Sequence, residues 1–521
     1  MRITLFILLL SFSSQAQRPF KNYIGVNGFE WNFQSNWSPV DETKGELIKP
    51  FDGFRHYLDW GRVEPDSNKY TYQPTINGGW GYDDIYTWCK ENSITVLLCL
   101  KNCPDWLVNT YPEDQRDGEN SPLPYGWDKS SPSSYKQMAK LGFQLAARYG
   151  SNTGVNPSLL SVEAQPSWAP NQKLIGLDLI TYIECNNEPD KDWKGPKAQQ
   201  SPEEYAANLS AFYDGHLGTL GAGVGVKNAD PNMKVVMAGT AGTKSWFLKR
   251  MIQWCHTYRA DSLCFDVINF HDYSQMRNGE WWSWTPDLSV NRGVAPEVSP
   301  VGDSVQVLIN IRDTAAPGMP IWITECGFDV NASSIQRALA IGSKNTRATQ
   351  ADWSLRTSLF YARKRIDRVF FYMLEDVDIN SPTQYASCGL IEDGERRPAA
   401  DFLLQAKNLL GDYHYDTTIN SNPLVDRYKR GDSTIYALII PDEIGRTGTY
   451  QLDLSGTGVT QVKVYTPTAG QDHMAVQTLN VTGGTVDIPA TETPVFVHLF
   501  SNSVITTVNH FIVNRKIIKR Q

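Results

Sequence analysis

The chain has 521 residues, 41% of them hydrophobic and 20% charged, which is the composition of an ordinary globular protein. Its length predicts one large domain with a smaller accessory domain rather than a single small one. A formal net charge of −8 argues against a nucleic-acid partner, because binding phosphates requires a basic surface.

The N-terminal segment has the three parts of a secretory signal peptide. Arg2 supplies the positive charge, residues 3–10 form a short apolar run, and Ser-Gln-Ala at 14–16 provides a small-residue cleavage site. The run is too short to span a bilayer, and no later stretch reaches the length of a membrane helix. We therefore expect residues 1–17 to be removed from a secreted or periplasmic protein that has no membrane span.

Between residues 18 and 411, short apolar runs alternate with longer patterns of helical periodicity. Eight runs predict strands at residues 23–29, 53–60, 94–100, 179–189, 234–240, 266–273, 320–328 and 368–374. Helical patterns fill the intervals, among them 133–150, 201–221 and 350–365. The runs are nearly continuous in hydrophobicity, as parallel strands are when both faces of a sheet are covered. This order predicts an α/β fold, a (β/α)8 TIM barrel with long loops rather than a doubly wound sheet.

Two of the predicted helices carry sequence signals at their ends. Ser201, followed three residues later by Glu204, predicts a capping box around Pro202 in the first helical position. Pro398 opens a final helix, and Gly411 is expected to end it.

After residue 411 the chain consists of short alternating segments separated by Gly, Asp, Asn and Thr. This pattern predicts antiparallel strands, and we expect a small β-sandwich accessory domain at residues 412–500. Residues 501–521 form a basic tail that is interpreted either as a terminal strand or as a sorting signal.

The eight cysteines are scattered and lack the paired C-x-x-C spacing of a zinc site. Cys255 and Cys264 are the most plausible local disulfide, but many pairings of eight cysteines are possible, so no connectivity is assigned. The acidic loop of Glu375, Asp376 and Asp378 is interpreted as solvated rather than as a calcium site. We therefore expect no metal and no cofactor.

Two of the predicted strands end in a carboxylate. Glu188 follows Asn187 at the end of the fourth strand, and Glu325 lies near the end of the seventh. Since the C-terminal ends of barrel strands meet at one mouth, both carboxylates are expected to converge there. Strand alternation also puts Glu184 on the same face as Glu188, subject to any bulge near the strand end.

A pair of carboxylates of this kind is what cleavage of a glycosidic bond requires. One carboxyl group protonates the leaving oxygen, and a second carboxylate attacks the anomeric carbon, with retention of configuration when about 5–5.5 Å separates them. Repulsion between the carboxylates and partial burial keep the acid protonated near neutral pH. A neighbouring amide such as that of Asn187 is able to hydrogen-bond the 2-hydroxyl of the sugar.

Five segments, in their order along the chain, resemble clan A of the glycoside hydrolases. They are FRHYLDWGRVEP (54–65), VLLCLKNCPDWL (96–107), YIECNNEPD (182–190), INFHDYS (268–274) and GLIEDGERRPA (389–399). The third is similar to the E-x-x-N-E-P strand of the family 39-like and family 5-like branches. The C-terminal segment, ending TETPVFV, resembles the accessory domain of such enzymes. The resemblance covers nearly all of residues 20–500 and implies catalytic glutamates on strands four and seven.

The resemblance also implies a role for each site residue. Glu188 would be the acid/base, Glu325 the nucleophile, and Asn187 the contact for the 2-hydroxyl. His271 and Tyr273 would line the site, with the Tyr273 hydroxyl hydrogen-bonded to Glu325.

Other candidate residues have two interpretations each. Arg55, at the usual second-strand arginine position, either favours ionisation of the nucleophile or is a buried ion-pair partner of Glu184. His271 is alternatively a hydrogen-bonded core histidine. Trp282, in the EWWSW segment, is either a sugar platform or part of the loop core. Where the clan usually has a Trp on strand eight, this chain has FFYML, which includes Tyr372.

Together these features imply a secreted retaining glycoside hydrolase whose partner is a β-linked poly- or oligosaccharide. A non-catalytic carbohydrate-binding protein on the same scaffold is an alternative, although a decayed site commonly loses a carboxylate and both are present here. A transglycosylase would use the same residues. The sugar, the linkage, endo or exo action and the oligomeric state stay open.

Overall fold

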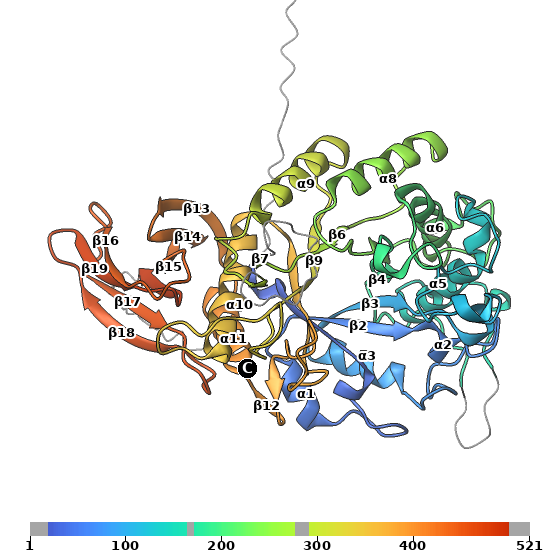
Figure 1. Ribbon diagram of the computed structural model, residues 1–521, viewed down its shortest axis with the longest axis horizontal. Helices are drawn as coiled ribbons and strands as arrows, with labels where there is room; N and C mark the ends of the chain where they lie inside the picture. Colours follow the sequence, from blue (N-terminus) through green and yellow to red (C-terminus); the bar gives the residue numbers. More distant parts are fainter. Residues whose placement is uncertain (1–18, 164–170, 277–290, 500–521) are drawn as a thin grey trace, which may run out of the picture.

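The computed structural model describes residues 19–163, 171–276 and 291–499 (Figure 1). The expected signal peptide, the C-terminal tail and Trp282 lie outside these ranges. No helix within the described ranges is long and apolar enough to cross a membrane.

Eight parallel strands form one sheet that closes into a barrel. They are β1 (Ile24–Gly28), β2 (Gly53–Asp59), β3 (Thr95–Lys101), β4 (Tyr182–Cys185), β5 (Lys234–Met237), β6 (Ile268–His271), β9 (Ile321–Cys326) and β10 (Arg368–Phe371). Hydrogen bonding follows the order β5-β4-β3-β2-β1-β10-β9-β6. Parallel bridges from Val236 to Val267 and from Thr240 to Phe270 join the two ends of the sheet. All eight predicted strands are present, which confirms the (β/α)8 barrel.

Helices surround the barrel (Figure 1). They are α1 (Glu42–Ile48), α2 (Trp60–Val63), α3 (Tyr82–Glu91), α4 (Asp105–Val108), α5 (Lys136–Tyr149), α6 (Pro202–Asp214), α7 (Val226–Ala229), α8 (Ser245–Tyr258), α9 (Val301–Ala315), α10 (Thr346–Arg363) and α11 (Pro398–Leu410). Strand residues such as Leu98 and Ile183 belong to one hydrophobic core with helix residues such as Phe143. Burial of both faces of the sheet explains why the strands read as continuous apolar runs.

A separate apolar layer fills the barrel interior below the strand ends. Its fully buried members are Leu97, Val236, Val267, Trp322 and Phe370. Gly25 of β1 leaves room for the Phe370 ring, since a Cβ at that position would lie 2.3 Å from it. The layer closes the barrel from below, so the polar residues above it face the mouth.

Helix α6 begins where the sequence predicts and ends earlier. The Ser201 hydroxyl accepts the backbone N–H of Glu204 at 3.3 Å, and the Glu204 carboxylate accepts the N–H of Ser201 at 2.8 Å. The capping box is therefore confirmed. The predicted extension to residue 221 is wrong, because Gly215 follows Asp214 with a left-handed φ of 66°. Glycine adopts this conformation without the steric cost that other residues meet.

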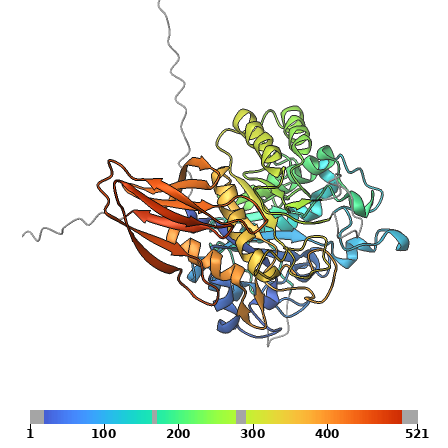
Figure 2. The same cartoon turned by 60° about the vertical axis from the view of Figure 1, so that its left-hand side comes forward.

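Beyond α11 the chain forms antiparallel sheets on one side of the barrel (Figures 1 and 2). The strands are β13 (His414–Ser421), β14 (Leu424–Arg430), β15 (Ser433–Ile439), β16 (Gly448–Asp453), β17 (Gln461–Thr466), β18 (Ala475–Asn480), β19 (Thr485–Ala490) and β20 (Val495–Leu499). Six of them pair in the order β13-β14-β15-β20-β17-β18, and β16 pairs with β19. Two-residue pairs also lie in loops, namely β7 (Gln275–Met276) with β8 (Arg292–Gly293) and β11 (Ile391–Glu392) with β12 (Glu395–Arg396). The predicted sandwich is present as two antiparallel sheets of unequal size.

The C-terminal strands pack against α10 and α11 (Figure 2). Arg363 of α10 forms a 2.9 Å ion pair with the buried carboxylate of Asp426 in β14. Gln405 of α11 donates a hydrogen bond to the carbonyl of Thr468 at 2.7 Å. Tyr428 of β14 belongs to the same hydrophobic core as the barrel helices. The barrel and the C-terminal strands therefore share a continuous interior.

Candidate active site

The carboxylates of Glu188 and Glu325 come together at the mouth of the barrel. Glu188 follows the end of β4, and Glu325 lies near the end of β9. With His271 of β6 they form a cluster in which one atom from each side chain lies within 4.8 Å of the others. The Glu325 side chain is 9% exposed and that of Glu188 is 20% exposed. Both carboxylates are thus mostly shielded from water, with Glu188 on the more open side.

The backbone leaves strand geometry just before Glu188. Asn186 has a φ of 74° and Glu188 a φ of 45°, which non-glycine residues seldom adopt. The N–H of Glu188 donates to the carbonyl of Gly239 at 3.1 Å, which holds this turn against β5. As a result Asn187 also faces the site, where its side-chain oxygen accepts a hydrogen bond from Arg55 at 2.8 Å. Simple strand alternation, which puts Asn187 and Glu188 on opposite faces, therefore fails at the strand end.

Arg55 is fully buried and makes both of the contacts considered for it, one with Glu184 and one with Glu325. Its guanidinium forms two hydrogen bonds with Glu184, at 2.7 and 3.0 Å. It also donates to Glu325 at 2.9 Å and to Asn27 at 3.0 Å. The charge-assisted bonds to Glu184 hold the guanidinium beside Glu325, so the ion pair with Glu184 orients the ion pair with Glu325.

Two tyrosine hydroxyls complete the surroundings of Glu325. Tyr273 donates to Oε2 at 3.0 Å, as the resemblance implied, and Tyr57 donates to Oε1. Sequence reasoning missed Tyr57. The signal was available, because Tyr57 is two residues after Arg55 in β2 and alternation places both side chains on one face.

His271 bridges the two carboxylates. Its Nδ1 lies 2.8 Å from Glu188 and its Nε2 lies 3.5 Å from Glu325. Gly239 leaves the space that the imidazole occupies, since a Cβ there would lie 2.3 Å from the ring. Burial by itself lowers the pKa of His271, but the two carboxylates outweigh it and raise that pKa. His271 is therefore buried and also contacts both carboxylates of the candidate site.

The two glutamates differ in their pKa shifts. Burial raises the pKa of Glu188 by more than the hydrogen bond and the charge of His271 lower it, and the charge of Glu325 adds a smaller increase. Burial also opposes ionisation of Glu325, but His271, Arg55 and the Tyr57 hydroxyl together lower the pKa of this carboxyl group. These surroundings therefore favour the protonated form of Glu188 and the ionised form of Glu325.

Aromatic rings lie around this cluster. The Tyr372 ring, at the position where the clan usually has a Trp, is 6.2 Å from that of Tyr57. On the outer side, Phe29 stacks on Tyr57 at 5.3 Å, and Trp31 stacks on Phe29 at 4.2 Å. Trp31 is 41% exposed, so this aromatic run reaches the surface. Trp282, the sugar platform considered from the sequence, lies outside the described residues.

The remaining candidate sites have other surroundings. Asp376 of the acidic loop forms an ion pair with Arg397, and Glu375 accepts a hydrogen bond from Asn32 at 2.8 Å. The sulfur atoms of Cys255 and Cys264 lie 3.6 Å apart as free thiols. A disulfide between these two cysteines stays a prediction.

No family model matches the chain, and no curated protein matches it. Three solved structures with similar folds are a family 39 glycoside hydrolase from Bacteroides cellulosilyticus WH2, a GH30 endoxylanase from Clostridium papyrosolvens C71 and a GH51 arabinofuranosidase from Xanthomonas axonopodis pv. citri. The first has a TM-score of 0.61 at 16% identity, covering 93% of this chain and 81% of its own. The other two each have a TM-score of 0.53 at 12% identity, covering 93% of this chain and 97% of their own. The chain therefore has the fold of the clan A glycoside hydrolases, a (β/α)8 barrel followed by antiparallel β-sheets.

Proposed function

We propose that this chain is an exported retaining glycoside hydrolase that cleaves β-linked poly- or oligosaccharides, with Glu188 as the acid/base and Glu325 as the nucleophile. One observation carries the proposal. Two glutamates meet at the mouth of the barrel, and their surroundings raise the pKa of one and lower the pKa of the other. A proton donor beside an ionised nucleophile is what double displacement at an anomeric carbon requires.

In the first step Glu188 protonates the leaving oxygen while Glu325 attacks the anomeric carbon. Arg55, Tyr57 and Tyr273 hold the two oxygens of Glu325 in place for this attack. Once Glu325 is esterified it carries no charge, so the pKa of Glu188 falls and this residue becomes the base that activates water. Water then displaces the sugar and restores both carboxyl groups.

Asn187 is proposed to bind the 2-hydroxyl of the reacting sugar. Its side-chain oxygen already accepts a hydrogen bond from Arg55, which leaves the amide nitrogen as the group that donates to substrate. This contact strengthens in the transition state, so it contributes to the rate as well as to binding.

The spacing of the carboxylates favours retention of configuration. Inverting enzymes separate the two groups by about 6.5–9.5 Å to accommodate a water molecule, whereas retaining enzymes need about 5–5.5 Å. Oxygens of Glu188 and Glu325 that lie within 4.8 Å of each other are closer to the second arrangement.

Among the described residues, the cluster of Glu188, His271 and Glu325 also has the composition of a metal site. Its electrostatics oppose this function. The Arg55 guanidinium lies 2.9 Å from Glu325, and its fixed positive charge repels a metal cation at that carboxylate. We therefore propose hydrolysis without a metal, and dialysis against EDTA is expected to leave the rate unchanged.

A hydrolysis screen of the purified protein tests the proposal. It covers β-glucans, mannans, galactans and xylans, and it includes arabinoxylan because the similar structures include an endoxylanase and an arabinofuranosidase. Proton NMR of the first-formed anomer is expected to show retention. Binding without turnover would favour the carbohydrate-binding alternative, and products longer than the substrate would indicate transglycosylation.

A further inference from the structure

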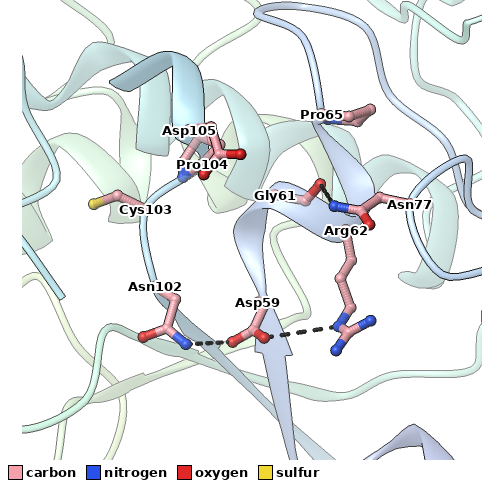
Figure 3. Close-up of a pocket in the computed structure, with 9 residues that line it drawn as sticks. All are labelled: Asp59, Gly61, Arg62, Pro65, Asn77, Asn102, Cys103, Pro104 and Asp105. Atoms are coloured by element: carbon pink, nitrogen blue, oxygen red, sulfur yellow. Dashed lines mark hydrogen bonds and ion pairs between the residues drawn. The ribbon is translucent and has the colours of Figure 1, made fainter. Parts of the chain in front are cut away.

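A polar cavity opens beyond the C-terminal ends of β2 and β3. Its volume is about 300 Å³, and neither Glu188 nor Glu325 lines it. Figure 3 shows Asp59, at the end of β2, between Asn102, just after β3, and Arg62 of α2. The cavity therefore lies at the same C-terminal end of the barrel as the catalytic glutamates.

The cavity is connected to the catalytic centre along β2. Alternation puts Arg55, Tyr57 and Asp59 on one face of this strand, and the first two contact Glu325. Two residues of strand advance the chain by about 7 Å, so Asp59 lies about that far beyond Tyr57 toward the mouth. Lys101, which pairs with Asp59 across the sheet, places its ammonium 4.7 Å from the centre of the Tyr57 ring. A glycan leaving the catalytic centre along this face would reach the cavity within a few sugar units.

The polar groups of the cavity retain hydrogen-bonding capacity. The Asn102 amide donates to one Asp59 oxygen at 2.6 Å. The Arg62 guanidinium lies 3.7 Å from the other Asp59 oxygen and 3.4 Å from a carboxylate oxygen of Glu30. Both separations exceed the 2.7–3.2 Å or so that N–H···O hydrogen bonds prefer. A carboxylate acceptor therefore stands beside a guanidinium donor with room for a ligand to bond both.

This arrangement matches the adjacent hydroxyls of a neutral sugar. A hydroxyl both donates and accepts, so neighbouring hydroxyls are able to bond Asp59 and Arg62 together. The lining carries two carboxylates, Asp59 and Asp105, against the single cation of Arg62, which disfavours an anionic ligand. Pro65 and Pro104 add apolar surface for the C–H groups of a sugar ring.

We propose that this cavity is a remote subsite that binds adjacent hydroxyls of a neutral sugar unit, so that the enzyme prefers glycan chains of several units over disaccharides. The inference rests on the proposed hydrolase function. A set of charge-assisted hydrogen bonds to one sugar unit predicts a gain of about tenfold or more in kcat/KM as the chain grows long enough to occupy the subsite.

The experiment measures kcat/KM for cello-, xylo- and manno-oligosaccharides of two to six units. The readout is the ratio between long and short substrates within each variant, which a uniform loss of activity does not change. Asp59→Ala is expected to reduce the wild-type ratio of about ten toward one. Asn102→Gly is a second variant that keeps the left-handed backbone, since Asn102 has a φ of 52°. Asp303→Asn, an exposed carboxylate on α9, is the matched control and should keep the wild-type ratio.

Each outcome has a distinct meaning. Cleavage that is independent of chain length would overturn the subsite and leave the hydrolase intact. If both cavity variants kept the preference for long substrates, the additional sugar units would bind elsewhere, and this result would also overturn the subsite. Absence of cleavage of every oligosaccharide and polysaccharide would instead overturn the hydrolase function, and the subsite with it.

Discussion

At the scale of single residues, Glu188 and Glu325 are chemically identical side chains made different by their neighbours. Glu325 contacts one guanidinium and two tyrosine hydroxyls, whereas Glu188 is hydrogen-bonded to His271 and lies nearer solvent. Each pKa unit corresponds to about 1.4 kcal/mol of interaction that distinguishes the two protonation states. The assignment of proton donor and nucleophile therefore rests on these contacts.

Chemical rescue with azide separates the two proposed functions. Glu325→Ala should nearly abolish turnover, because no covalent intermediate forms, and azide should restore activity by giving a glycosyl azide of inverted configuration. Glu188→Ala should still react with substrates that have good leaving groups, since these need little protonation. Azide should then give a product of retained configuration. Product stereochemistry by NMR is the measurement, and the opposite pattern would mean that the roles are reversed.

The pH dependence of kcat/KM should follow the pKa shifts of Glu188 and Glu325. As the proposed nucleophile, Glu325 must be ionised, so activity should persist as the pH falls until the pH passes through a pKa below the ordinary 4.5 or so of a glutamate. As the proposed acid, Glu188 must be protonated, so activity should be lost as the pH rises through its raised pKa. In Glu188→Gln, assayed with an activated aryl glycoside, the alkaline limb should disappear. Persistence of that limb would contradict the assignment of Glu188 as the acid.

At the scale of elements, the site depends on how closely neighbouring strands approach. Gly239 follows β5 and does three things there. Its N–H donates to Glu184 at 3.1 Å, its carbonyl accepts from Glu188, and its missing side chain leaves the space for His271. The barrel closes at this seam between β5 and β6, so one small residue positions groups from β4 and β6 at once.

Gly239→Ala should therefore damage activity more than folding. A methyl group 2.3 Å from the His271 ring forces the imidazole to move, and with it the hydrogen bond to Glu188. A displacement of this kind is expected to reduce kcat/KM by about a hundredfold. Gly223→Ala is the matched control, because its nearest neighbouring atoms, on Leu159, are 3.9 Å away. Steady-state kinetics with circular dichroism checks the outcome, and normal kinetics in Gly239→Ala would show that His271 has room to adapt.

At the scale of the whole molecule, the barrel and the C-terminal strands behave as one body. Tyr428, Ile435 and Phe496 belong to the same hydrophobic core as the barrel helices. The ion pair of Arg363 with Asp426 lies within this junction, where the Asp426 side chain is 1% exposed. Because the barrel and the C-terminal strands share a core, they are expected to unfold together in one transition.

Asp426→Ala should test this junction, because it leaves the Arg363 guanidinium without its partner. Breaking such a pair should lower the free energy of unfolding by about 3–5 kcal/mol. For a chain of this length that corresponds to a decrease in Tm of about 3–5 °C. Asp416→Ala, which breaks a more exposed pair with Arg427, should cost about 1 kcal/mol or less. Calorimetry should show one transition that moves as a whole, whereas two transitions would contradict the shared core.

Much of this arrangement was predictable because its signals are local. The eight strands are continuous apolar runs in the sequence. Ser201 and Glu204, three residues apart, predict the start of α6. The placement of Glu188 and Glu325 followed from the rule that barrel strands end at one mouth. Gly239 and the turn at Asn187 were missed, because their importance comes from residues far away in the chain.

The sequence by itself determined the order of strands and helices, the change to antiparallel strands after residue 411 and the two carboxylates at strand ends. Hydrophobic periodicity and turn residues involve neighbouring positions in the chain, so a single sequence is enough to recognise them. Only the tertiary structure decided which glutamate has the lowered pKa and which the raised one. The pKa shifts depend on Arg55 and His271, which lie on other strands than the two glutamates. Electrostatic energy depends on the distance between charges, and that distance is known only once the chain is folded.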